Sequence, residues 1–244
     1  MDGRDCDRCK YGQLPDGTAC SCSFGAVFQR YLDDLARQMD GHGRPLGLDI
    51  IPARYRGNTA ADLVTLFQGD AQKLATLKRV GAWARMTWAE QKVHSMFLWG
   101  PVGTGKTTVA MFALSQFLKS GHAARWVYWS EWITQVDALD FQEGNAEVLE
   151  LTKVPVLLLD DLGSQDRVDS RGDLAPETNK RQDTVRTILN TRMTKGVPTI
   201  ITTNLSPEQF GIVWGERVAS RVAEDFWIES VTGADLRLSV GVNK

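Results

Sequence analysis

Eight consecutive residues near the middle of the chain have the types and spacing of a phosphate-binding loop, G-x-x-x-x-G-K-[ST]. They are Gly100, Pro101, Val102, Gly103, Thr104, Gly105, Lys106 and Thr107. Glycines let backbone N–H groups wrap a phosphate, Lys106 would neutralise β- and γ-phosphate oxygens, and the Thr107 hydroxyl would ligate Mg²⁺. The alternative is a glycine-rich turn with an exposed lysine. It is disfavoured because an apolar segment precedes the loop and a helical segment follows it.

Two adjacent carboxylates, Asp160 and Asp161, follow the apolar run at 154–159. Ligands of an open α/β sheet bind at the carboxyl ends of its strands, where these acids would lie. Asp160 would hold Mg²⁺, and Asp161 is the candidate for polarising an attacking water. The alternative, a solvated acidic turn, is weak beside a phosphate-binding loop.

Three more polar residues could act on a nucleotide. Asn204 ends the run at 198–203; taken alone it is more typical of a turn than of a catalytic group. Arg217 and Arg221 lie four residues apart, on one face of a helical turn, where an arginine could reach a γ-phosphate of a neighbouring subunit. Without the preceding motifs they would be ordinary surface arginines. No NKxD sequence follows a strand, so guanine specificity has no support.

The segments that must position these residues alternate between strand and helix. Apolar runs predict strands at 94–99, 125–129, 154–159, 198–203 and 226–231. Helical periodicity predicts helices at 24–39, 104–119 and 184–193 and helical structure over 58–92, and Ser130 is predicted as a helix N-cap. The pattern indicates an α/β fold, a parallel sheet with helices on both faces.

Eight tryptophans are present, and three of them follow one another closely after residue 125. Trp126, Trp129 and Trp132 could pack in the core or stack on the bases of single-stranded DNA. A core position is the better expectation for alternating strand residues.

All four cysteines lie in the first 22 residues, at Cys6, Cys9, Cys20 and Cys22. The two close pairs suit four thiolates that converge on one zinc ion. The intervening stretch is too short to build a core, so metal binding would have to stabilise it. Four reduced thiols on a frayed terminus are the alternative.

Composition and charge exclude several classes of protein. The chain has 244 residues, 43% of them hydrophobic and 24% charged, which is ordinary for a globular domain. Its net charge of -2 gives no global basic field for nucleic acid, so any DNA contact would need a local patch. No apolar run is long enough for a membrane span, and the start lacks the apolar core of a signal peptide. We expect a cytoplasmic protein without membrane contact.

Taken in order, the segments LWGPVGTGKT, VLLLDDLG, TIITTN and GERVASRV resemble the AAA+ ATPases of the DnaC- and DnaI-like helicase-loader group and the similar IstB-like transposition helpers. The resemblance covers about residues 45–244 and implies a P-loop AAA+ core. By this resemblance Asn204 is sensor 1, Arg221 the arginine finger, Arg217 its companion and Arg237 the sensor 2 arginine. The cysteines resemble the zinc-binding end of several loaders, whose N-terminal region contacts the helicase.

Two departures from the family pattern matter. Asp161 stands where many AAA+ proteins have glutamate, and its shorter side chain is expected to slow hydrolysis. The chain also ends soon after Arg237, without room for the usual helical lid. The implied organisation is a zinc-binding segment at 1–25, a helical linker at 26–75 and an ATPase domain without a separate lid at 76–244.

The leading functional hypothesis is an ATP-driven loader that places a replicative helicase on single-stranded DNA and self-associates into a ring or helical oligomer. Its cofactors would be ATP, Mg²⁺ and Zn²⁺. The alternative within the family is a transposition helper acting on double-stranded DNA with a transposase. A P-loop kinase for a small molecule and a non-hydrolysing, zinc-bearing adaptor are alternatives of other classes.

Overall fold

The computed structural model describes residues 51–239 apart from 56–58, 90–93, 120–121 and 164–167. The four cysteines and the helix expected at 24–39 lie outside the described residues. Among the described helices, none has both the length and the apolar character needed to cross a membrane.

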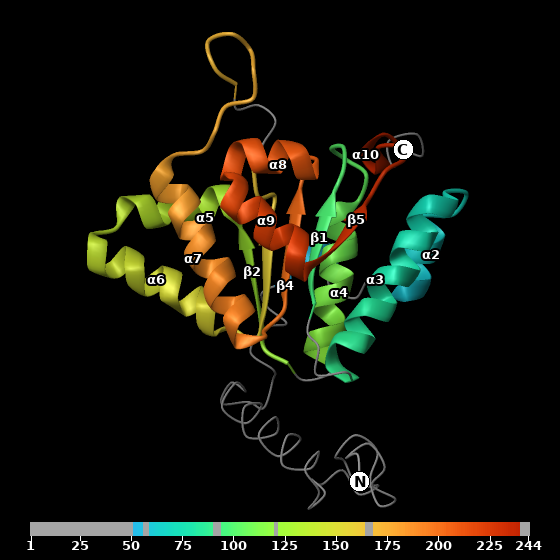
Figure 1. Ribbon diagram of the computed structural model, residues 1–244. Coiled ribbons are helices and arrows are strands. Elements are labelled where there is room, and N and C mark those ends of the chain that lie inside the picture. Colours follow the sequence, from blue (N-terminus) through green and yellow to red (C-terminus); the bar gives the residue numbers. More distant parts are fainter. Residues whose placement is uncertain (1–50, 56–58, 90–93, 120–121, 164–167, 240–244) are drawn as a thin grey trace, which may run out of the picture.

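A five-stranded parallel sheet forms the centre of the described chain, with strand order β2-β3-β4-β1-β5 (Figure 1). The bounds are β1 Ser95–Trp99, β2 Ala124–Tyr128, β3 Val156–Asp160, β4 Thr199–Thr203 and β5 Phe226–Ser230. Strands β3 and β4 are buried along their whole length, as continuous apolar or β-branched runs predict. The expected parallel α/β fold is confirmed, and every expected strand is present within two residues at each end.

Helices cover both faces of the sheet, and alternate residues of β3 show the division. Val156 and Leu158 belong to one buried cluster, whereas Leu157 and Leu159 belong to the other. The first cluster contains side chains of α2 (Ala60–Leu66), α3 (Ala71–Ala89) and α4 (Lys106–Lys119). The second is covered by the remaining long helices, namely α5 Trp129–Ala138, α6 Phe141–Lys153, α7 Asn179–Lys195, α8 Pro207–Trp214 and α9 Glu216–Asp225.

The helical region expected at 58–92 is divided in two. Helix α2 begins after Thr59, whose side chain forms a capping box with Asp62. It ends before Gly69, which has a φ of 87°. Helix α3 then continues without a break across residues 75 and 76, the expected boundary between the helical linker and the ATPase domain. Both helices pack in the same cluster as α4. These helices therefore belong to the packed body of the sheet domain.

Other helix boundaries differ from the sequence-based expectation. Ser130 is not an N-cap, because α5 already begins at Trp129 with Tyr128 in the capping position. Helix α4 starts two residues later than expected, since Gly105 has a φ of 100°. Helix α7 is longer than the expected 184–193 because Thr178 caps its start and left-handed Gly196 ends it.

A fully buried arginine, Arg192 of α7, connects the C-terminal end of α6 to the start of β4. Its guanidinium donates to the backbone oxygens of Leu151 (2.8 Å), Val154 (2.6 Å) and Pro198 (2.6 Å) and to the hydroxyl of Thr199 (2.8 Å). One side chain therefore satisfies acceptors from α6, from its C-cap and from the start of β4.

Replacing Arg192 by methionine is expected to lower the free energy of unfolding by about 3 kcal/mol or more, because several buried acceptors lose their donor together. Urea denaturation measures the change. Arg171→Met is the control, since that side chain is 83% exposed and should leave stability unchanged. Equal stability of the two variants would contradict this role for Arg192.

Candidate functional site

The glycine-rich loop joins the end of β1 to the start of α4, as the motif requires. Gly100 has a φ of 147° and Gly103 a φ of 79°. A Cβ atom on Gly100 would collide with the backbone oxygen of Val231, and one on Gly103 with the Asp235 carboxylate. Both positions therefore need glycine for their conformation, and Gly100 needs it also for the close approach of the backbone that follows β5.

Lys106 is the first residue of α4, and its side chain curls back into the loop. It is 7% exposed, and its ammonium donates to the backbone oxygens of Gly100 (2.8 Å) and Pro101 (2.7 Å). Burial lowers the pKa of Lys106 to about 8, against the opposing effect of the nearby charges of Asp161 and Asp160. The loop thus holds a poorly solvated cation that an anionic phosphate would stabilise.

Asp160 ends β3 and is 3% exposed. Its Oδ1 accepts hydrogen bonds from the hydroxyls of Thr107 (2.9 Å) and Thr202 (2.5 Å). Its Oδ2 accepts one from the indole N–H of Trp126 (3.2 Å). The Thr107 hydroxyl and the Asp160 carboxylate are oxygen ligands of the kind that Mg²⁺ prefers, and the fold brings them together from α4 and β3.

Asp161 follows directly and has a φ of 58°, in the left-handed region that few residues other than glycine adopt. Its backbone N–H donates to the Thr202 hydroxyl (2.9 Å). Its carboxylate accepts from the Asn204 side-chain amide (3.2 Å) and from the Tyr128 hydroxyl (3.4 Å). Strained backbone of this kind is often found at functional sites, and here it turns the second carboxylate toward Asn204.

The electrostatic environment of the Asp161 carboxylate suits it to act as a general base. Burial raises the pKa of Asp161, and the adjacent charge of Asp160 raises it further. The Tyr128 hydroxyl and the charges of Lys106 and Arg237 act in the opposite direction. A carboxylate with a raised pKa is better suited to accept a proton at neutral pH.

The segment after β5 lies across the loop. The Val231 amide donates to the Trp99 oxygen (2.7 Å), and the Leu236 amide to the Gly103 oxygen (2.9 Å). Asp235 accepts from the backbone N–H of Arg237 (2.8 Å) at the start of the short helix α10 (Leu236–Ser239). Exposed Arg237 is close enough for its charge to lower the pKa of Lys106.

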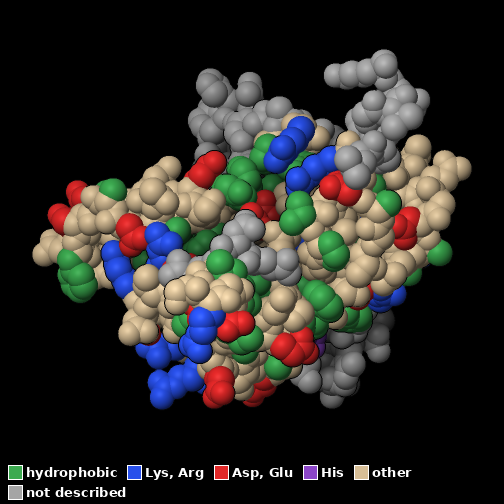
Figure 2. Space-filling view, turned by 90° about the horizontal axis from the view of Figure 1, so that it is seen from above, with side chains coloured by type: hydrophobic (Ala, Val, Ile, Leu, Met, Phe, Trp, Pro, Cys, Tyr) green, Lys and Arg blue, Asp and Glu red, His purple; other side chains and the backbone are tan. Residues whose placement is uncertain are grey.

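Figure 2 shows basic and acidic side chains gathered near the middle of the face at the carboxyl ends of the strands. The segment that precedes α2 also comes close to this face of the sheet. Tyr55, in the short 3₁₀ helix η2 (Ala53–Tyr55), has a pKa that burial raises, and the charges of Asp160 and Arg237 affect it as well.

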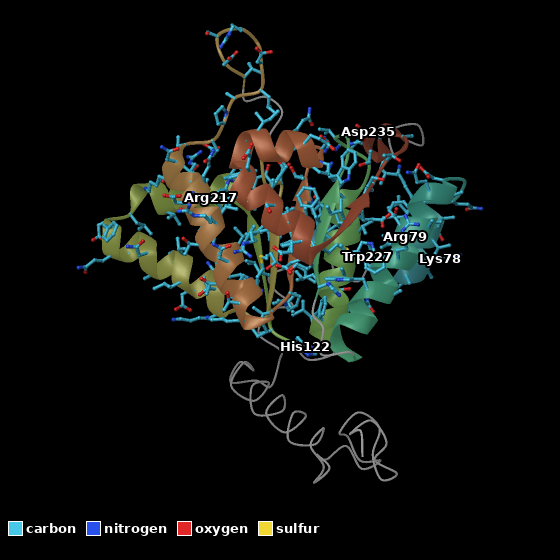
Figure 3. The ribbon with its side chains drawn as sticks, viewed as in Figure 1. Lys78, Arg79, His122, Arg217, Trp227 and Asp235 are labelled. Carbon is cyan, nitrogen blue, oxygen red and sulfur yellow. The ribbon has the colours of Figure 1, made fainter. Side chains whose placement is uncertain are left out.

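Arg217 and Arg221 lie elsewhere on the molecule, on α9. Together with Arg186 of α7 they line an open groove of about 690 Å³, and none of the phosphate-loop residues lines it. The Arg221 side chain is 52% exposed and has Glu224 at 3.6 Å. Figure 3 shows Arg217 on the opposite side of the view from Asp235, which contacts the loop. The two arginines are therefore not brought to Lys106 within one chain.

Two residues on β2 that contact the acids were not expected at the site. Trp129 and Trp132 are buried in the core, as expected, but Trp126 is only partly buried and reaches Asp160. Tyr128 reaches Asp161. The signal available in the sequence is that Trp126 and Tyr128, two aromatic side chains with a hydrogen-bond donor, alternate on one predicted strand.

In the part of the chain that the structure describes, no group of three or more His, Cys, Asp or Glu side chains is placed to hold a metal ion. The four cysteines lie outside that part, so the zinc site stays a prediction.

The parallel sheet, the loop between β1 and α4, and the acids at the end of β3 define an α/β AAA+ fold. The family model described as IstB-like ATP binding protein matches residues 66–225. The chain belongs to this family of ATP-binding proteins.

Known relatives agree with this assignment. The chain is 24% identical over 141 residues to a replicative helicase loader, DnaI, of Bacillus subtilis (strain 168); the match covers 57% of this chain and 42% of that protein. The chain thus spans less than half of that relative.

Solved structures share the fold. A crystal structure of DnaI has a TM-score of 0.59 at 23% identity and covers 77% of this chain and 94% of its own. The DnaC helicase loader has a TM-score of 0.60 at 22% identity, covering 74% of this chain and all of the other. The initiator DnaA, bound to AMPPCP and single-stranded DNA, has a TM-score of 0.57 at 19% identity; it covers 79% of this chain and 54% of its own.

Proposed function

We propose that this protein is an ATPase that loads a replicative helicase onto single-stranded DNA during the initiation of replication. The observation that carries the ATPase part is the convergence of Lys106, Thr107, Asp160 and Asp161 at one edge of the sheet. The loader part is supported by the similarity to a protein named as a replicative helicase loader. In this proposal the protein works in the cytoplasm.

The loop would bind the triphosphate through its backbone N–H groups and the Lys106 ammonium. Thr107 and Asp160 would hold Mg²⁺, and their oxygens, 2.9 Å apart, fit one small cation. Bound Mg²⁺ would neutralise charge on the phosphate oxygens. The residues of this chain would hold the triphosphate in place and keep the Asp160 carboxylate oriented.

Asp161 would take the proton of the attacking water, whose oxygen forms a bond to the γ-phosphorus as the bond to ADP breaks. Asn204, which donates to Asp161 Oδ1, would help to hold that carboxylate and sense the γ-phosphate. Asp161 is one methylene shorter than the glutamate usual in AAA+ proteins, so slow turnover is expected.

Arg221, with Arg217 beside it, would reach the γ-phosphate of a neighbouring subunit, because the groove that they line is separate from the loop of their own chain. Such an interface is head-to-tail and produces a ring or a helical filament. Arg237, in contrast, would contact the nucleotide bound to the loop of its own chain.

The family also includes IstB-like proteins, so a transposition helper acting on double-stranded DNA is the alternative function. ATPase activity measured without DNA, with single-stranded DNA and with duplex DNA distinguishes the two. The loader is expected to respond to single strands and to bind the replicative helicase in a pull-down. Stimulation by duplex DNA alone would favour the transposition helper, and hydrolysis that needs a small phosphate acceptor would indicate a kinase.

The N-terminal segment, residues 1–25, is proposed to bind about one zinc ion per chain through Cys6, Cys9, Cys20 and Cys22. Elemental analysis of the purified protein is expected to find that zinc. Removal by a chelator, followed by dialysis into Mg²⁺, should leave ATP binding unchanged, since residues 23–244 contain no cysteine. Absence of zinc together with four freely titrating thiols would overturn this assignment.

A further inference from the structure

The carboxylate of Asp160 is held by donors from three different elements. Both hydroxyl donors, Thr107 of α4 and Thr202 of β4, bind Oδ1. Among the described residues, the hydrogen bond recorded for Oδ2 comes from the indole N–H of Trp126, on β2. Trp126 thus orients Oδ2, the carboxylate oxygen that accepts from neither threonine hydroxyl.

The sheet register explains how Trp126 reaches this position. In the parallel pair of β2 and β3, Trp126 lies opposite Leu158, and Tyr128 lies opposite Asp160. The side chains of Trp126 and Leu158 share one face of the sheet, where both join the cluster around α4. The indole therefore reaches forward along the sheet by one side-chain repeat to meet the carboxylate.

We propose that Trp126 is a positioning residue, which fixes the Asp160 carboxylate for the divalent cation that accompanies the nucleotide. This inference rests on the proposed function, because it takes Asp160 as the residue that holds Mg²⁺. It assigns to the edge strand β2 a part in cation binding in addition to its part in the sheet.

The physical reason lies in the burial of Asp160. With 3% of the residue exposed, water has little access to replace a donor lost at Oδ2. Without the indole N–H, the carboxylate is restrained at one oxygen only and can rotate about its last bond. Loss of a group that orients a metal-binding carboxylate typically weakens metal binding by about 10-fold or more.

The test compares Trp126→Phe with a matched control, Trp132→Phe. Trp132 is also nearly buried, at 7% exposed, but its indole nitrogen has no hydrogen-bond partner in the described structure. Both variants lose an indole ring, and only the first loses a donor to Asp160. Fluorescence anisotropy of a labelled, non-hydrolysable ATP analogue measures affinity in EDTA and in Mg²⁺, so the readout is binding.

In the wild type, Mg²⁺ should tighten binding of the analogue. Trp126→Phe should keep the affinity measured in EDTA and lose about 10-fold of the gain that Mg²⁺ provides. Trp132→Phe should keep the full gain. An unchanged gain in Trp126→Phe, or an equal loss in both variants, would overturn the role of Trp126.

A second variant separates the donor from the shape of the ring. Benzothienylalanine at position 126 replaces the indole N–H by sulfur and keeps the bicyclic ring, so it should reproduce the loss seen in Trp126→Phe. Full Mg²⁺ dependence in this variant would contradict the inference even if Trp126→Phe folds poorly. Wild-type protein that binds no nucleotide would instead refute the proposed function itself.

Discussion

Alanine at position 106 is expected to lower the ATP hydrolysis rate by about 100-fold or more, because it removes the cation that neutralises the β- and γ-phosphates. The fold should persist. Burial lowers the pKa of Lys106 to about 8, below its ordinary value of 10.5, so at neutral pH the charged side chain opposes folding. The Lys106→Ala variant should therefore unfold at a temperature no lower than that of the wild type.

Nucleotide binding, steady-state ATP hydrolysis and thermal unfolding together check this expectation. Lys153→Ala is the matched control, because that lysine is 61% exposed and pairs with Glu150 in the same helix. The control should behave as the wild type in all three measurements. Normal affinity and turnover in Lys106→Ala would show that the loop does not serve ATP.

The second large effect is expected for Arg221→Ala, which should retain nucleotide affinity and lose about 10³-fold in hydrolysis rate. The affinity is retained because Arg221 lies in the groove between α7 and α9, apart from the loop of its own chain. The rate is lost because the charge that develops on the γ-phosphate would lack its partner from the neighbouring subunit.

Labelled-nucleotide binding and single-turnover hydrolysis separate the two effects. Arg125→Ala is the control, since that arginine pairs with Glu147 on α6. Weakened nucleotide binding by isolated Arg221→Ala subunits, or an unchanged hydrolysis rate in the assembly, would contradict a role in a neighbouring site.

The sequence predicted the parts of the fold that depend on local pattern. The five strands are recognisable because they are short apolar runs, and the loop 100–107 because its glycines and lysine have a fixed spacing. The helical turn that carries Arg217 and Arg221 is confirmed in α9. The sequence does not define the bounds of α5, α6 and α8, since the positions that these helices bury become apparent only against the sheet.

Contacts between distant segments could not be derived in this way. Trp126 and Asp160 are 34 residues apart, and their hydrogen bond depends on the register of β2 with β3. The collision that keeps Gly100 a glycine involves the backbone oxygen of Val231, far along the chain and beyond β5. The sequence shows the residue types at both ends of such contacts, but only the fold shows that they meet.

In the proposed function, ATP bound to the loop of one subunit is hydrolysed with the help of an arginine of the next subunit. The most direct measurement is the ATPase activity of a mixture of the Lys106→Ala and Arg221→Ala variants, each inactive alone. In mixed assemblies some interfaces join an intact loop to an intact arginine, so partial activity should return. If the variants demonstrably assemble together and no activity returns, the shared site is contradicted.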